Sequence, residues 1–214
     1  MKYRIAYIDE NDGWLNTFYQ TFKSEFEVLK IKVNSESTIA SIIDEVFNSE
    51  ADCVITDYLL EEEGDVDFNG NNIVEAIREK KPYFPITMLT SYEPQAISNT
   101  EDVHIINGKS DLDGESDEDL EVLKAKIKSS IESYHKKIER TEKKIKDLVK
   151  KKNENSLEPR EEEELTKLFI LMDDLEPDGK DIPANLIQPE AITKLNDFVN
   201  QTREILEELK KKNK

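Results

Sequence analysis

Cysteine and histidine are almost absent from the 214-residue chain, which holds one cysteine, Cys53, and two histidines, His104 and His135. A lone cysteine cannot form an internal disulfide, and Cys53 lies in an apolar run where a buried, inert thiol is expected. The chain also has no CxxC, HExxH or GxxxxGK[ST] motif. These absences argue against a zinc site and against most histidine-based catalysis.

Long apolar stretches are missing as well. No run approaches the length of a membrane-spanning helix, and the first residues, MKYRIAYIDE, contain no apolar signal-peptide core. We therefore expect a soluble, cytoplasmic protein with no membrane partner.

Basic residues are scarce in the first part of the chain. The net charge is -18, and residues 1–118 contain 9 Lys+Arg against 26 Asp+Glu, whereas residues 119–214 contain 21 against 22. This acidity argues against direct binding to nucleic acid, which requires a basic surface. The change of charge balance near residue 118 marks two regions of different kind.

The first region alternates short apolar runs with amphipathic segments. The spacing of apolar residues predicts strands over residues 3–8, 26–33, 52–56, 84–89 and 103–106. It predicts helices over residues 14–22, 38–47, 71–80 and 94–99. This alternation indicates an α/β fold with a doubly wound, five-stranded parallel sheet and helices on both of its faces. In such sheets functional groups collect beyond the carboxyl ends of the strands.

The second region has the apolar period of packed helices. A heptad pattern of about three and a half repeats is carried by Ile127, Ile131, Tyr134, Ile138, Thr141, Ile145 and Leu148. Further helices are predicted over 161–175 and 190–210, separated by a long turn at 176–189. We therefore divide the chain into an α/β domain at 1–118, a long coiled-coil helix at 119–153 and two helices within 154–214. The heptad also allows a parallel homodimer through residues 120–150.

Polar side chains follow four of the five predicted strands, in the order Asp9 and Glu10, Asp57, Thr90 and Ser91, and Lys109. Three neighbouring carboxylates raise one another's pKa values unless a divalent cation lies among them, and oxygen ligands with open positions suit Mg²⁺. A lysine and a hydroxyl beside them suit the oxygens of a phosphoryl group. The chemistry that fits is attack by a carboxylate on a phosphoryl donor, which gives an acyl phosphate.

This ordered set resembles the receiver domain of two-component response regulators, over residues 1 to about 135. The resemblance implies a flavodoxin-like fold with strand order 2-1-3-4-5 and phosphorylation of Asp57 by a histidine kinase or phosphotransfer protein. It also implies the supporting residues. Mg²⁺ would be held by Asp9, Glu10, Asp57 and the backbone carbonyl of Leu59. The phosphoryl group would be bound by Thr90, Ser91 and Lys109, with Thr90 as the switch hydroxyl.

Several features depart from the pattern of the receiver family, among them a weak fourth helix and the polar insertion SDLDGESD before the fifth. Ser110 follows Lys109 where the family usually has a proline, and Ile106 stands where it usually has an aromatic switch residue. The segment EEEGDVDFNG, residues 61–70, is long and acidic where the family usually has a short methionine-proline turn. These departures affect the usual route from phosphate to output surface and leave the phosphorylation chemistry in place.

Two further positions tune the lifetime of the phosphoryl group in receivers, and here they hold Leu59 and Tyr92. Neither side chain offers a carboxylate or an amide that could orient a water molecule. We therefore expect the acyl phosphate to hydrolyse slowly.

Several functions remain consistent with these residues. The first is a response regulator, not a conventional enzyme, whose C-terminal helices signal by dimerising or by binding an unknown protein effector, or which serves as a phosphate sink. The second is a pseudo-receiver scaffold that binds or oligomerises without phosphotransfer. A hydrolase of the aspartate-nucleophile type is a third, but it would need a second aspartate where Leu59 stands. His135 lacks the acidic neighbour of a kinase histidine, so a solvated side chain is expected there.

Overall fold

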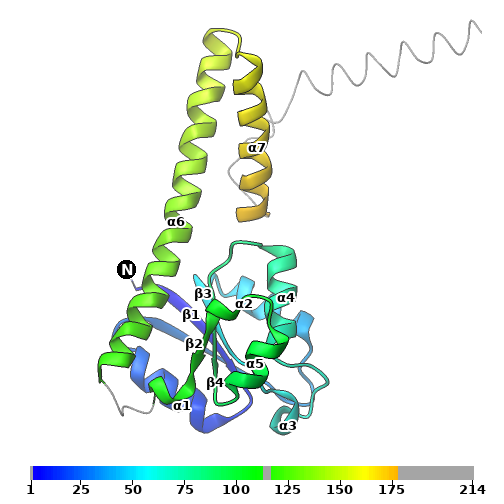
Figure 1. Cartoon of the computed structure of the whole chain (residues 1–214), viewed down its shortest axis with the longest axis vertical. Coiled ribbons are helices and arrows are strands. Elements are labelled where there is room, and N and C mark those ends of the chain that lie inside the picture. The colour runs from blue at the N-terminus through cyan, green and yellow to red at the C-terminus, as the bar shows by residue number, and fades with distance from the viewer. Residues whose placement is uncertain (1, 113–116, 178–214) are drawn as a thin grey trace, which may run out of the picture.

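Five parallel strands form the centre of the molecule, in the spatial order β2-β1-β3-β4-β5 (Figure 1). Their bounds are β1 Arg4–Asp9, β2 Glu27–Lys32, β3 Cys53–Asp57, β4 Ile86–Thr90 and β5 Ile106–Gly108. The computed structural model describes residues 2–112 and 117–177, so the predicted helix at 190–210 lies outside the described residues. The strand order confirms the predicted α/β, flavodoxin-like fold.

The last strand is shorter than predicted and begins later. Residues Val103–Ile105, predicted to be extended, form a 3-10 turn in which the side chain of Asp102 accepts a hydrogen bond from the backbone N–H of His104 at 3.1 Å. A side chain that bonds to the nearby backbone in this way competes with the strand ladder. The strand therefore starts only at Ile106 and ends at Gly108, directly before the lysine of the predicted site.

Helices cover both faces of the sheet. One face is packed against α1, Asp12–Phe22, and the first turns of α6, Asp117–Glu154, through apolar residues such as Phe18, Phe22 and Ile127. The other face is packed against α2, Ile39–Asn48, α4, Gly70–Lys80, and α5, Glu93–Asn99. The central strands β1, β3 and β4 are almost entirely buried as a result. This double burial explains their near-continuous apolar sequences.

The acidic segment 61–70 is partly helical and not a loop throughout. Its first residues form one helical turn, α3, Glu61–Gly64. The side chain of Asn69 accepts hydrogen bonds from the backbone N–H groups of Leu60 at 2.9 Å and Glu61 at 3.2 Å. These bonds tie the two ends of the segment together beside the end of β3.

A helical hairpin rises from the sheet. Helix α6, Asp117–Glu154, is continuous for 38 residues, and α7, Pro159–Leu175, folds back along it (Figure 1). The heptad residues nearer the start of α6, Ile127 and Ile131, pack on the sheet. Further along the helix, Ile145 packs on α7 together with Leu168 and Met172. The heptad stripe is therefore covered within one chain, partly by the sheet and partly by α7.

The end of α7 is anchored at the amino-terminal edge of the sheet. The hydroxyl of Tyr134 donates a hydrogen bond to the carbonyl of Leu175 at 2.5 Å, and the ring of Tyr134 meets Phe84, which precedes β4, edge to face. His135 lies next to this contact, with Nε2 at 3.1 Å from Asp52 Oδ1. Among residues 2–112 and 117–177, none of the helices has the length and apolarity that a membrane crossing requires.

Candidate functional site

The carboxyl ends of four strands meet at one edge of the sheet, opposite the end where α7 is anchored. Asp9 ends β1, Asp57 ends β3 and Thr90 ends β4. The strand register places Asp57 beside Leu89 and Thr90 beside Gly108, the residue that precedes Lys109. The topology thus brings the predicted acidic, hydroxyl and lysine residues to the same edge.

Lys109 joins two of the carboxylates. Its Nζ lies 2.9 Å from Asp9 Oδ2 and 3.0 Å from Asp57 Oδ2, and all three side chains are at least 96% buried. Burial lowers the pKa of Lys109, but Asp57 and Asp9 raise it by more, so the amine stays protonated. A charge buried this deeply persists only because its partners are in contact.

Two carboxylate oxygens in this group accept no hydrogen bond. They are Glu10 Oε2 and Asp57 Oδ1, and both atoms are buried. Burial, with the nearby carboxylates, raises the pKa of Glu10 to about 7. Burial also raises the pKa of Asp57 to about 6, although Lys109 opposes the shift. The protein alone therefore leaves part of this negative charge uncompensated.

The donor set fits a divalent cation. One oxygen each of Asp9, Glu10 and Asp57 lies within 4.8 Å of the others, and no other trio of such ligands is found in the described residues. Orphaned carboxylate oxygens are the hard ligands that Mg²⁺ prefers, and Mg²⁺ keeps open positions for a phosphate or water. The predicted role of the Leu59 carbonyl as a further ligand stays a prediction.

A cavity of about 160 Å³ opens at this group. Its lining includes Glu10, Asp57 and Lys109, together with Leu59, Ser91 and Tyr92 of the predicted set. Thr90 does not line the cavity. Its side chain is fully buried, and its hydroxyl accepts a hydrogen bond from the backbone N–H of Tyr92 at 3.0 Å. The predicted switch hydroxyl therefore holds the β4–α5 turn in this structure, while Ser91 borders the cavity.

Comparison with known proteins rests on structure, because no protein-family model and no curated protein matches the chain. The signal receiver domain of an HD domain-containing protein from Pseudomonas fluorescens Pf-5 aligns with a TM-score of 0.50 and 18% identity, over 65% of this chain and 93% of that chain. The chain has the fold of a receiver domain.

Other solved receivers align at lower TM-scores. A response regulator receiver protein from Sinorhizobium medicae WSM419 aligns with a TM-score of 0.45 and 18% identity, over 61% of this chain and 95% of that chain. A CheY-like receiver domain protein from Methanospirillum hungatei JF-1 aligns with a TM-score of 0.45 and 16% identity, over 62% and 99%. At such identities the likeness concerns the fold, and the chemistry must be argued from the residues of this chain.

Three side chains at this acidic site were missed by the sequence analysis. The hydroxyl of Tyr7 donates a hydrogen bond to Asp9 Oδ2 at 2.5 Å. The ring of Trp14 lies under Lys109, with Nζ 5.0 Å from the ring centroid, and Glu62 of α3 borders the cavity. Strand periodicity carries a signal for Tyr7 alone, since residues two apart on a strand share a face. Trp14 and Glu62 reach the site only through the packing of α1 and α3.

Gly70, the first residue of α4, was also missed, and its importance is steric. A Cβ atom at this position would lie 1.9 Å from the carbonyl oxygen of Asp57 and 3.1 Å from Thr56 Oγ1. The backbone N–H of Gly70 donates to the carbonyl of Tyr58 at 2.8 Å, so α4 starts in direct contact with the chain around Asp57. Only a residue without a side chain allows this approach.

We expect Gly70→Ala to displace the Asp57 backbone. This should lower the free energy of unfolding by about 1–3 kcal/mol. It should also slow any covalent modification of the Asp57 side chain. Urea unfolding and intact-mass measurements on the same variant would test both effects. Gly64→Ala is the matched control, because the three atoms nearest to its Cβ would all be side-chain atoms, Val33 Cγ1 at 3.1 Å and Glu10 Cβ and Val66 Cγ2 at 3.5 Å. Equal losses in the two variants would contradict the steric role of Gly70.

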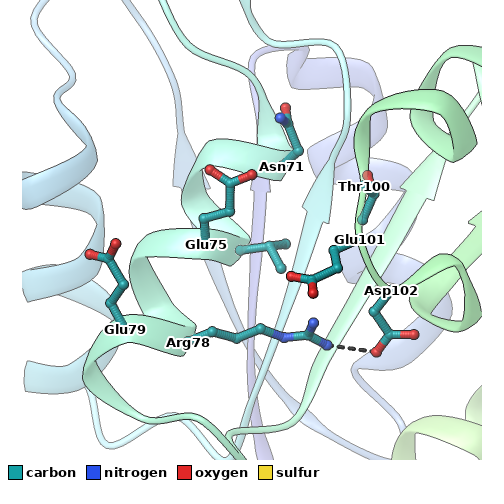
Figure 2. Close-up of a pocket in the computed structure, with 8 residues that line it drawn as sticks. Asn71, Glu75, Arg78, Glu79, Thr100, Glu101 and Asp102 are labelled. Atoms are coloured by element: carbon teal, nitrogen blue, oxygen red, sulfur yellow. Dashed lines mark hydrogen bonds and ion pairs between the residues drawn. The ribbon is translucent and has the colours of Figure 1, made fainter.

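A second cavity lies away from the acidic site, between α4 and the segment that follows α5 (Figure 2). It measures about 380 Å³, and Glu75, Glu79 and Glu101 contribute carboxylates to its lining. Arg78 Nη2 pairs with Asp102 Oδ2 at 2.7 Å, and this hydrogen bond lowers the pKa of Asp102. This cavity is larger than the one beside Asp57, but its acidic groups are not brought together as metal ligands.

Proposed function

We propose that the protein is a response regulator that accepts a phosphoryl group on Asp57 from a histidine kinase or a phosphotransfer protein. One observation carries the proposal. Asp57 has one oxygen held by buried Lys109 at 3.0 Å, and its other oxygen is buried without a hydrogen-bond partner in a cavity that it shares with Glu10. A structural aspartate would have both oxygens satisfied.

The geometry supports a direct transfer. One carboxylate oxygen of Asp57 forms a bond to phosphorus while the bond from phosphorus to the donor breaks, and the donor keeps that electron pair; the other carboxylate oxygen would ligate the cation. Lys109 is placed to neutralise charge on the transferred oxygens, because it already bridges Asp9 and Asp57. Asp9, Glu10 and Asp57 would hold Mg²⁺, which would supply further neutralisation of phosphoryl charge.

Treatment with acetyl phosphate and Mg²⁺ tests this function. We expect the intact mass to rise by one phosphoryl group in the wild type and in Asp67→Asn, an exposed aspartate in the segment after Asp57. We expect no adduct in Asp57→Asn, and none in the wild type with excess EDTA. An adduct that survives in Asp57→Asn would refute phosphorylation at this residue.

The pseudo-receiver scaffold is the second candidate, and one observation favours it. The helical hairpin is anchored at the amino-terminal edge of the sheet through Tyr134 and Leu175, at the opposite end from Asp57. Ile106, where receivers usually have an aromatic switch residue, is only partly buried against the core. No adduct in the experiment above, with the wild type folded, would favour the scaffold.

The hairpin is the proposed output element of the response regulator. Its heptad residues Ile131 and Ile145 are already buried within the chain, Ile131 against the sheet and Ile145 against α7. A parallel homodimer through residues 120–150 would therefore require α6 to leave both α7 and the sheet. We therefore propose that the hairpin signals by binding a protein effector through its exposed faces. A change of oligomeric size with beryllofluoride and Mg²⁺, measured by light scattering, would indicate dimerisation instead.

A further inference from the structure

Asp9 is held quite differently from the other two carboxylates of the cluster. Its Oδ2 accepts hydrogen bonds from the Tyr7 hydroxyl at 2.5 Å and from Lys109 Nζ at 2.9 Å, and its Oδ1 accepts one from the backbone N–H of Asn11 at 2.9 Å. Glu10 and Asp57 each keep one oxygen without a donor. Asp9 is therefore the fixed member of the three, and Tyr7 is one of the groups that fix it.

Tyr7 is itself held rigidly. It lies on the central strand β1 with no exposed surface, and its ring stacks on Phe18 with centroids 4.1 Å apart and planes 17° apart. Phe18 in turn stacks on Phe22 at 4.1 Å. A phenol packed between a sheet and a helix in this way has one accessible position for its hydroxyl. Tyr7 is thus suited to hold Asp9 in one orientation, because its own hydroxyl cannot move with that carboxylate.

We propose that Tyr7 is a positioning residue that fixes Asp9 for binding of the divalent cation; this inference rests on the proposed function. The reason lies in the double use of Lys109, which contacts Asp9 and Asp57 together. When Lys109 turns to a phosphoryl group, Asp9 loses one of its side-chain donors. Tyr7 keeps Oδ2 in place at that moment. Loss of a partner that orients a metal ligand typically weakens metal affinity by about 10- to 100-fold.

Mg²⁺ titration of Tyr7→Phe tests the proposal. The change removes one oxygen atom and keeps the stacked ring. Trp14, the only tryptophan of the chain, borders the cavity and provides a fluorescence signal for binding. We expect Tyr7→Phe to bind Mg²⁺ about tenfold more weakly than the wild type. Tyr134→Phe is the matched control, because it removes a buried hydroxyl that donates to Leu175 far from the site, and it should bind Mg²⁺ as the wild type does.

The possible results distinguish the role of Tyr7 from the proposed phosphorylation of Asp57, on which it rests. Equal Mg²⁺ affinity in Tyr7→Phe and wild type would overturn the role of Tyr7 and leave the proposed function standing. Absence of Mg²⁺ binding to the wild type, by fluorescence and by calorimetry, would overturn both. Equal weakening in Tyr7→Phe and Tyr134→Phe would show a general loss of stability and would also overturn the specific role.

A second measurement leaves Tyr7 unchanged and covers the case in which Tyr7→Phe does not fold. Protein labelled with ¹³C at the tyrosine ζ carbon reports the hydrogen bond of each phenol. Tyr92 also borders the cavity, so the label is placed in Tyr92→Phe, which removes the signal of that phenol. Mn²⁺ in place of Mg²⁺ would then broaden the signal of Tyr7 most strongly, and we expect that signal to shift when Mg²⁺ is added. A Tyr7 signal that is broadened by Mn²⁺ and unmoved by saturating Mg²⁺ would overturn the proposal.

Discussion

In metal-free buffer at pH 8, Asp57→Asn should be more stable than the wild type by about 1–3 kcal/mol. Asp57 is 3% exposed, and its folded-state pKa is raised from 3.8 to about 6, mainly by burial. A shift of this size corresponds to at most about 3 kcal/mol, and relaxation of the site reduces it. An asparagine still accepts a hydrogen bond from Lys109 but carries no charge.

The sign of the pH dependence follows from the raised pKa. A carboxyl whose pKa is higher in the folded state binds its proton more tightly there, so it favours folding most at pH values below its unfolded pKa. That contribution is lost as the pH rises from about 4 through about 6 for Asp57 and about 7 for Glu10. Metal-free wild type should therefore lose stability relative to Asp57→Asn between pH 5 and pH 8, measured by urea unfolding.

Mg²⁺ should reverse this difference, because it binds the folded state alone. At about 100 times its dissociation constant, Mg²⁺ stabilises by about 2.7 kcal/mol, and we expect this gain in the wild type and little of it in Asp57→Asn. Asp67→Asn, which removes the same charge from an exposed position, is the control for the overall net charge of -18. If both variants gain the same stability at pH 8, the effect belongs to the net charge and not to the site.

Met172→Asp should release α7 from α6 while the receiver sheet stays folded. Met172 is 3% exposed and packs with Ile145, Leu165 and Leu168 in the upper part of the hairpin. An unpaired carboxylate at this position costs about 3 kcal/mol. Because the hairpin above Tyr134 makes its own apolar cluster, the loss should stay local.

Hydrogen exchange resolved by segment would measure this effect. We expect amide exchange about a hundredfold faster in α7 and in the upper part of α6, with β1, β3 and β4 unchanged. Ile170→Asp is the matched control, because Ile170 is a neighbouring apolar residue of the same helix with 60% of its surface exposed. Faster exchange in the central strands of Met172→Asp would show that hairpin and sheet unfold as one unit.

The sequence alone determined the order of the elements and the edge at which the polar residues meet. Apolar spacing is a local property, and parallel strands joined by helices bring their carboxyl ends to one edge. The sequence therefore predicts that Asp9, Asp57 and Lys109 lie together. In the structure Lys109 Nζ lies within 3.0 Å of a carboxylate oxygen of each aspartate. The boundary of β5 was less predictable, because a side chain, Asp102, competes there with the strand ladder.

Only the tertiary structure decided which groups complete the site and what covers the helices. The contact of Gly70 with the Asp57 carbonyl, and that of Trp14 with Lys109, join residues far apart in the chain. Thr90 has the expected position, but its side-chain direction is set by the turn that follows. A heptad pattern likewise predicts that one face of α6 is covered, but it does not identify what covers that face. Helix α7 supplies part of this cover within the same chain. The short link between Glu154 and Pro159 lets the chain reverse its direction, so that α7 packs antiparallel to α6.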